Sequence, residues 1–286
     1  MAASTAALRG ITKQYKDFTL GPVDMTVPAG SIVGLIGENG AGKTTLLKIL
    51  CGVNRADDGT VDLLGGSPAD AATRAKIGVV FEDAFFYGSF TAAQVARSLA
   101  GMYGARWNVD SFSVYLRRFG LDTGKKLKEY SRGMRLKLSL AAALAHDPEL
   151  LVLDEATAGL DPVVRGELLD LFLEFIQDER HSIVMSSHIT ADLEQIADSI
   201  AYLHNGQLLF QENKDDLLQE YGVLHCGEDV LPSLPAGLVV FTRRGAYGCE
   251  SLVRERRTVQ ELLPEAVCDA ARLDDIMRFY SGRDAQ

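Results

Sequence analysis

Residues 37–45 read Gly-Glu-Asn-Gly-Ala-Gly-Lys-Thr-Thr, which is a glycine, four residues, and then Gly-Lys-Thr. The apolar residues 31–36 before this stretch predict a short buried strand, and the apolar residues of 46–50 recur at helical spacing. A strand, a glycine loop and a helix in this order can cradle phosphates, because glycines let backbone N–H groups turn inward and the helix start favours anions. Lys43 is expected to reach the β- and γ-phosphates, and Thr44 to offer a hydroxyl to Mg²⁺. A glycine turn that binds nothing is the alternative, and the agreement between motif and context disfavours it.

Composition bounds the rest of the chain. The 286 residues are 47% hydrophobic, which is enough for a sizeable core in one large or two modest domains. A formal charge of −10 argues against a broad basic face for nucleic acid. The four cysteines lack metal-ligand spacing, and the chain shows neither a signal-peptide layout nor an apolar run of transmembrane length. We therefore expect a soluble chain with idle thiols, whose membrane role, if any, comes through a partner.

Carboxylates and a histidine follow three further predicted strands. Asp154 and Glu155 come directly after the apolar residues 150–153, Glu82 follows strand 77–81, and His188 follows strand 182–186. Open α/β sheets place ligands at the carboxyl ends of their strands. Asp154 is a candidate ligand for Mg²⁺, and Glu155 is a candidate to polarise the attacking water. Solvated loop carboxylates and a structural histidine are the alternatives.

Two weaker candidates lie on either side of these strands. Tyr15 precedes the glycine loop and can stack on a purine base, although an ordinary strand aromatic reads the same way. Ser131 opens a predicted helix with Gly133 in its first turn, and exposed amides there form a second possible anion site. Capping of the helix alone also explains Ser131.

The element pattern predicts an α/β fold of the P-loop NTPase type. Residues 8–27 read as two or three short strands, and residues 91–102, 109–119 and 131–145 read as helices of an inserted helical subdomain at about 88–146. A boundary is expected after residue 221, because the composition shifts there. Residues 222–286 are expected to be a small α+β appendage, with strands at 238–242 and 250–255 and a helix at 272–280.

Together these motifs resemble the nucleotide-binding subunit of ABC transporters over residues 7–220. The matching positions, in chain order, are the base-stacking Tyr15, the phosphate loop with Gly37, Asn39, Gly40, Gly42, Lys43, Thr44 and Thr45, the signature with Ser131 and Gly133, the metal-binding Asp154, the catalytic Glu155, the dimer-interface Asp161 and the switch His188. The resemblance implies a mixed sheet with an antiparallel β-subdomain and an inserted helical subdomain. It also implies ATP and Mg²⁺ as cofactors.

The chain departs from the family pattern at a few positions. Glu82 stands where the family usually has glutamine, and it becomes a candidate metal ligand. Arg132 and Met134 replace a glycine and a glutamine of the signature, and Ala156 stands where proline commonly follows the catalytic glutamate. This form of the signature and the appended C-terminal region resemble the subfamily that exports peptides, antibiotics or lipids. The nearest likeness is the ATPase of the phenol-soluble modulin exporters.

The resemblance implies a peripheral subunit at the cytoplasmic face of the cell membrane. Its partners are an integral membrane transporter subunit and a second ATPase subunit, either a copy of this chain or a similar one. ATP is expected to lie between residues 37–45 of one subunit and residues 131–133 of the other. Force is expected to pass to the membrane subunit through a groove between the two subdomains, near Glu82 and the aromatic residues 85–90. A soluble or regulatory ABC ATPase that moves no cargo is the alternative, and the cargo itself does not follow from this sequence.

Overall fold

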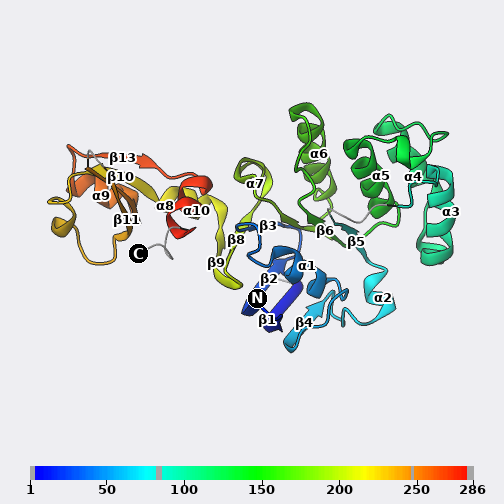
Figure 1. Cartoon of the computed structure of the whole chain (residues 1–286), viewed down its shortest axis with the longest axis horizontal. Helices are drawn as coiled ribbons and strands as arrows, with labels where there is room; N and C mark the ends of the chain where they lie inside the picture. The colour runs from blue at the N-terminus through cyan, green and yellow to red at the C-terminus, as the bar shows by residue number, and fades with distance from the viewer. Residues whose placement is uncertain (1–3, 82–85, 246–247, 282–286) are drawn as a thin grey trace.

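The computed structural model describes residues 4–81, 86–245 and 248–281, and its centre is a six-stranded sheet (Figure 1). The strands lie in the order β5-β6-β7-β3-β8-β9, all parallel except β9, which runs antiparallel to β8. They are β3 (Ile32–Ile36), β5 (Ile77–Val80), β6 (Leu150–Asp154), β7 (Ser182–Ser186), β8 (Ser199–His204) and β9 (Gln207–Asn213). Strands β3, β6 and β7 are buried along their whole length, as their apolar sequences predict for strands covered on both faces. Their carboxyl ends meet at one edge of the sheet.

A second, antiparallel sheet packs against the first. It has the order β2-β1-β4 and consists of β1 (Ser4–Gln14), β2 (Thr19–Pro28) and β4 (Asp58–Leu63). The strands predicted as short at residues 8–27 are in fact two long ones, because register shifts let the β1–β2 pairing continue past its irregular positions. Apolar residues of this sheet, including Leu8 and Val23, share a core with Leu35 of β3 and Leu46 of the following helix.

The helices before residue 214 divide into two groups (Figure 1). Those near the central sheet are α1 (Lys43–Leu50), α2 (Ala71–Arg74), α6 (Pro162–Phe175) and α7 (Thr190–Ile196). Those beyond β5 are α3 (Ala92–Tyr103), α4 (Val109–Arg118) and α5 (Arg132–Leu144), with the 3₁₀ turns η1 (Gly104–Arg106) and η2 (Leu127–Glu129). The three helices predicted in this second group agree with the structure to within one residue at each end. Among the residues that the structure describes, none of the helices is both long and apolar enough to cross a bilayer.

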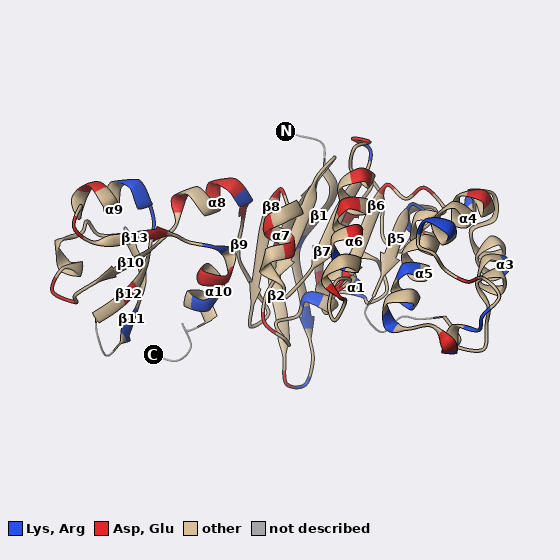
Figure 2. Cartoon of the chain, turned by 90° about the horizontal axis from the view of Figure 1, so that it is seen from above, with Lys and Arg blue, Asp and Glu red and all other residues tan. Residues whose placement is uncertain are grey.

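The C-terminal part forms a third sheet with the order β11-β12-β10-β13 (Figure 2). The elements of this C-terminal part, in chain order, are α8 (Lys214–Glu220), β10 (Gly222–Cys226), η3 (Leu231–Ser233), β11 (Val239–Gly245), β12 (Gly248–Val253), α9 (Arg256–Leu262), β13 (Val267–Ala270) and α10 (Leu273–Ser281). The sequence predicted β11, β12 and α10 but not β10, β13 or α9. The helix α10 reaches back toward β8 and β9, where Tyr280 shares a core with Tyr202.

Candidate functional site

The glycine loop joins β3 to α1, and its backbone leaves no room for side chains at two positions. A Cβ on Gly37 would lie 2.2 Å from the carbonyl oxygen of Leu203, and one on Gly42 would lie 2.9 Å from the ring of Phe18. Gly42 also has φ 107°, which favours glycine, and it stands immediately before the first residue of α1. Glycine is therefore the residue that fits at both positions, and the inward turn of the loop amides stays a prediction.

Lys43 points into the loop rather than into solvent. Its Nζ donates to the carbonyl oxygens of Gly37 at 2.7 Å and Glu38 at 3.2 Å, and the residue is only 6% exposed. The backbone carbonyls thus hold a buried cation at the mouth of the loop.

A cavity of about 370 Å³ opens beside this lysine. Its lining residues are Tyr15, Phe18, Glu38, Asn39, Gly40, Gly42, Lys43, Thr44, Thr45 and Glu155. The structure thus brings Tyr15 together with the phosphate loop, as the sequence predicts, and the tyrosine keeps an exposed face. Phe18, with its ring centroid 6.5 Å from that of Tyr15, is a second aromatic of the cavity that sequence reasoning missed. Its position in the sequence, three residues after the stacking candidate Tyr15, was the signal that could have identified it.

Asp154 lies at the end of β6 and is held by two hydroxyls. Thr44 Oγ1 donates to its Oδ2 at 2.8 Å, and Ser186 Oγ donates to its Oδ1 at 2.6 Å. Burial and this carboxylate raise the pKa of the nearby Cys51 thiol to about 12. A hydroxyl and a carboxylate with hydrogen-bonded oxygens form a donor set that suits Mg²⁺, so the residues present fit that ion.

Glu155 lies between Lys43 of the glycine loop and His188. Its Oε1 lies 3.4 Å from Lys43 Nζ, and its Oε2 lies 2.6 Å from Nδ1 of His188. The Glu155 amide donates to both the carbonyl oxygen and Oγ of Ser186, at 3.2 and 3.1 Å, while its backbone adopts a φ of 51°. A carboxylate fixed at both ends beside the cavity is well placed to take a proton from water.

The residues predicted to form the signature and the dimer interface, Ser131, Gly133 and Asp161, do not line this cavity. Ser131 caps α5 by accepting the Met134 amide at 3.2 Å, and Asp161 caps α6 by accepting the Val164 amide at 3.0 Å. A Cβ on Gly133 would lie 3.5 Å from Leu160, so the start of α5 sits beside the loop that leads into α6. The structure therefore brings Ser131, Gly133 and Asp161 near one another.

Two sequence predictions fall on residues whose structure is not described. Glu82, the expected metal ligand in place of glutamine, lies outside the described residues, as does Phe85 of the aromatic cluster. Conversely, Ser186 was read only as part of a strand, although it contacts both Asp154 and Glu155. Its one signal is a hydroxyl at the carboxyl end of an apolar strand.

Comparison with known proteins fits this geometry. The family model described as ABC transporter matches residues 20–158. The lantibiotic transport ATP-binding protein SrtF of Streptococcus pyogenes is 33% identical over 211 residues, which are 73% of this chain and 90% of that protein. This chain belongs to the ABC transporter ATP-binding family.

Two further relatives show how much of the length of related ABC proteins this chain matches. The bacitracin transport ATP-binding protein BcrA of Enterococcus faecalis is 35% identical over 212 residues, which are 72% of this chain and 68% of BcrA. An uncharacterised ABC transporter ATP-binding protein of Synechocystis is 39% identical over 206 residues, but the match spans 70% of this chain and only 58% of that relative.

Solved structures confirm the fold class. A structure titled as the ATP binding subunit of an ABC transporter is 28% identical, has a TM-score of 0.68, and covers 75% of this chain and 92% of its own. A dimeric post-hydrolysis structure of the ATP-binding cassette MJ0796, bound to ADP and Pi, is 23% identical and has a TM-score of 0.66. The match covers 73% of this chain and 98% of that one, and at this identity it supports the fold alone. The chain thus carries the ABC ATPase domain, of a family that binds ATP. The likeness to phenol-soluble modulin exporters stays a prediction.

Proposed function

We propose that this ABC protein binds ATP with Mg²⁺ and hydrolyses it to drive a membrane exporter. The observation that carries the proposal is the placement of Glu155. Its two carboxylate oxygens face Lys43 and His188, next to the pair formed by Thr44 and Asp154. A phosphate-binding cation, a metal-binding pair and a general base therefore surround one cavity.

Binding requires Lys43 to exchange partners. Its ammonium now contacts two backbone carbonyls and the Glu155 carboxylate. A bound triphosphate offers it stronger anionic acceptors, so Nζ turns to the β- and γ-phosphates while the loop amides surround them. Thr44 and Asp154 would hold Mg²⁺, which neutralises phosphate charge when bound. Glu155 is then free of the lysine and accepts a proton from water, while His188 orients its carboxylate.

A second ATPase subunit completes the site in this proposal. Ser131 and Gly133 begin a helix, and the start of a helix favours a phosphate. They lie outside the cavity of their own chain, so a head-to-tail pair would lay them over the nucleotide of the partner, with Asp161 at the interface. ATP then holds the two subunits together, and hydrolysis releases them. Capping accounts for Ser131 without any partner, and a dimerisation experiment separates the two accounts.

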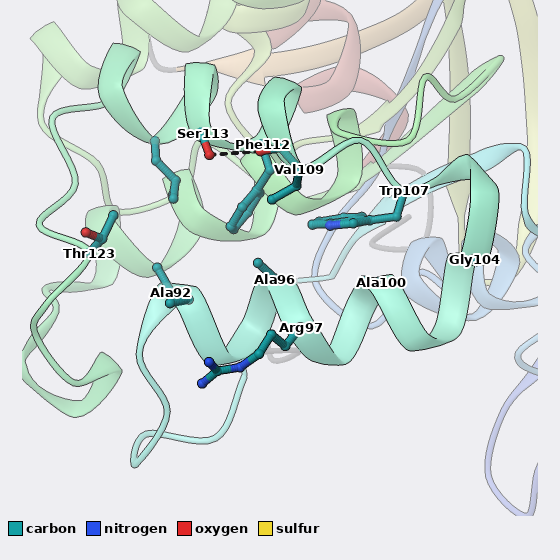
Figure 3. Close-up of a pocket in the computed structure, with 12 residues that line it drawn as sticks. Ala92, Ala96, Arg97, Ala100, Gly104, Trp107, Val109, Phe112, Ser113 and Thr123 are labelled. Atoms are coloured by element: carbon teal, nitrogen blue, oxygen red, sulfur yellow. Dashed lines mark hydrogen bonds between the residues drawn. The ribbon is translucent and has the colours of Figure 1, made fainter.

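The membrane partner is proposed to dock on the helical region. A groove of about 650 Å³ lies between α3 and α4 (Figure 3). Ala92, Ala96 and Ala100 of α3 form one wall, and their small side chains leave the groove open toward Trp107 and Phe112. Force transfer was expected between the two subdomains, near Glu82 and the aromatic residues 85–90, whereas this groove lies within the helical region that follows them in sequence. An apolar segment of a membrane subunit would fill it.

The remaining proposals concern organisation and cargo. We place the ATPase domain at residues 1–221, with its helical subdomain at about 88–146, and an accessory domain at 222–286. Through its partner the chain would sit at the cytoplasmic face of the cell membrane. The names of BcrA and SrtF, which refer to bacitracin and lantibiotic transport, support an amphipathic peptide or antibiotic-like cargo.

A Glu155→Gln variant tests the function. It should bind ATP like the parent, accumulate as an ATP-bound dimer, and lose at least about 100-fold in turnover, because the base is removed while the binding groups stay. Glu149→Gln, at the opposite end of β6, is the matched control and should turn over normally. Lys43→Ala should lose ATP binding. Undiminished hydrolysis by Glu155→Gln would reject the assignment.

Copurification decides between an exporter and a regulatory ATPase. The full chain is expressed with its membrane subunit, and ATPase activity is measured with and without amphipathic peptide. Stimulation by peptide in the complex supports export. A chain that hydrolyses ATP but neither copurifies with the membrane subunit nor responds to peptide would favour the regulatory alternative.

A further inference from the structure

Two cysteines face each other across the C-terminal sheet. Cys226 ends β10, and Cys249 lies directly opposite it in the antiparallel register of β12. Their sulfur atoms are 3.8 Å apart, and both are free thiols. The Cys249 thiol donates to the carbonyl oxygen of Cys226 at 3.1 Å. Opposed residues in a β ladder are close enough for a disulfide to join them with little backbone movement.

The residue beside Cys249 permits this close approach. A Cβ on Gly248 would lie 2.9 Å from the carbonyl oxygen of Cys226, and the glycine has φ 133°. The missing side chain thus lets the start of β12 lie tightly against the end of β10.

The two thiols differ in access. Cys226 lines an open cavity of about 490 Å³ together with Val230, Leu263 and Pro264. Cys249 is not part of that lining and is only 3% exposed. A small reagent in the cavity therefore meets Cys226 first, with Cys249 waiting within reach of its sulfur.

The other two cysteines are placed differently. Cys51 is buried and directly follows the last residue of α1, a helix that lies well away from the C-terminal sheet (Figure 1). Cys268 lies on β13 directly opposite Leu224, so its neighbour across the ladder is not a thiol. The geometry thus singles out one pair of the four.

We propose that Cys226 and Cys249 are a thiol oxidation site at which hydrogen peroxide forms a cross-strand disulfide. The Cys226 sulfur attacks the peroxide, the O–O bond breaks, and a sulfenic acid and one water form. Cys249 then attacks the sulfenic sulfur, the S–S bond forms, and a second water leaves. Two thiol sulfurs lose two electrons in total, and the peroxide gains them.

The disulfide would close a loop over residues 227–248 and tie the β11–β12 hairpin to β10. Before oxidation, burial, the hydrogen bond to the Cys249 thiol and the charge of Asp229 raise the pKa of Cys226 to about 11. The thiol form therefore prevails at neutral pH. Because the thiolate is the nucleophile, the pair reacts slowly and responds to sustained oxidation rather than to brief signals.

Peptide mapping of the full chain tests the proposal. After treatment with hydrogen peroxide and blocking of the remaining thiols, the chain should lose the mass of two hydrogen atoms, and the peptides holding Cys226 and Cys249 should be joined until a reductant is added. Protease nicks within residues 227–248 should leave the fragments linked on a non-reducing gel. The link should also raise the melting midpoint of the parent by a few degrees.

Matched variants keep the result interpretable. Cys268→Ser should form the same link, whereas Cys226→Ser and Cys249→Ser should each abolish it while circular dichroism stays like that of the parent. A link from Cys226 to Cys268, a link between two chains, or a sulfenic or sulfinic acid that persists on Cys226 would overturn the proposal. None of these readouts depends on ATP hydrolysis, so the two proposals can fail separately.

Discussion

Through one hydroxyl, Ser186 contacts the carboxylate of Asp154 and the backbone amide of Glu155. Its Oγ donates to Asp154 at 2.6 Å and accepts the amide of Glu155 at 3.1 Å, and the side chain is fully buried. It therefore fixes the direction of the Asp154 oxygen that faces away from Thr44. It also holds the backbone of Glu155 in its left-handed conformation. Ser186, which the sequence analysis did not single out as a functional candidate, thus positions the two predicted site residues Asp154 and Glu155.

Replacing Ser186 with alanine should lower kcat more than it changes the KM for ATP. A hydrogen bond to a charged group contributes about 1.5–3 kcal/mol, so a loss of about tenfold in kcat is expected if part of it acts in the transition state. Ser182→Ala in the same strand is the control, because that hydroxyl contacts Thr5 instead of the carboxylates. Steady-state kinetics at varied Mg²⁺ distinguish the outcomes. Equal kinetic constants for Ser186→Ala and Ser182→Ala would show that Ser186 only packs.

At the scale of elements, the predictable parts are those whose sequence pattern is set by burial. Strand β6 reads as an apolar run because both faces are covered, and its polar exit then falls at the shared edge of the sheet. Strand β13 could not be predicted, because only Cys268 of its four residues is buried and its edge position imposes no alternation. The contact of Ser186 with Asp154 could not be predicted either, because the sequences of β6 and β7 do not reveal that these two strands are neighbours in the sheet.

The helical region holds an unusual buried histidine just after α5. His146 is 2% exposed and stacks on Tyr103 of α3 with ring centroids 4.3 Å apart. Burial lowers the pKa of His146 from 6.5 to about 4, because the charged ring would lose its hydration. The contact between α3 and the end of α5 therefore depends on a neutral imidazole.

This histidine should make the helical region sensitive to acid. The unfolded chain takes up the proton near pH 6.5 and the folded chain only near pH 4, so stability falls as pH drops through that window and the loss reaches about 3 kcal/mol below it. Denaturant unfolding of the full chain between pH 7 and 4 measures the slope. His146→Phe should flatten it, whereas Phe112→Leu, which trims a buried side chain without any titratable group, should leave the slope unchanged. A parent-like slope in His146→Phe would refute this account.

At the scale of the whole molecule, one aromatic cluster joins the C-terminal part to the central sheet. The ring of Tyr280 on α10 lies 5.7 Å from Tyr202 of β8, 5.5 Å from Phe210 of β9 and 4.9 Å from Phe241 of β11. Tyr221 links to the same cluster through its hydroxyl, 3.4 Å from that of Tyr280. The same rings thus pack on strands of both sheets, so the C-terminal part and the edge of the central sheet share this packing.

Removing the ring of Tyr280 should loosen this junction while each sheet stays folded. Truncation of a buried aromatic side chain to alanine costs about 3–5 kcal/mol, and here the loss falls on packing between two sheets rather than within one. Hydrogen exchange of Tyr280→Ala should therefore speed up in α10, β9 and β11, with β3 and β6 unchanged. Tyr280→Phe keeps the ring and loses only the hydroxyl contact, so it should exchange like the parent. Equal acceleration of β3 in Tyr280→Ala would mean that the two sheets unfold as one unit, and the proposed boundary at residue 221 would then have no energetic basis.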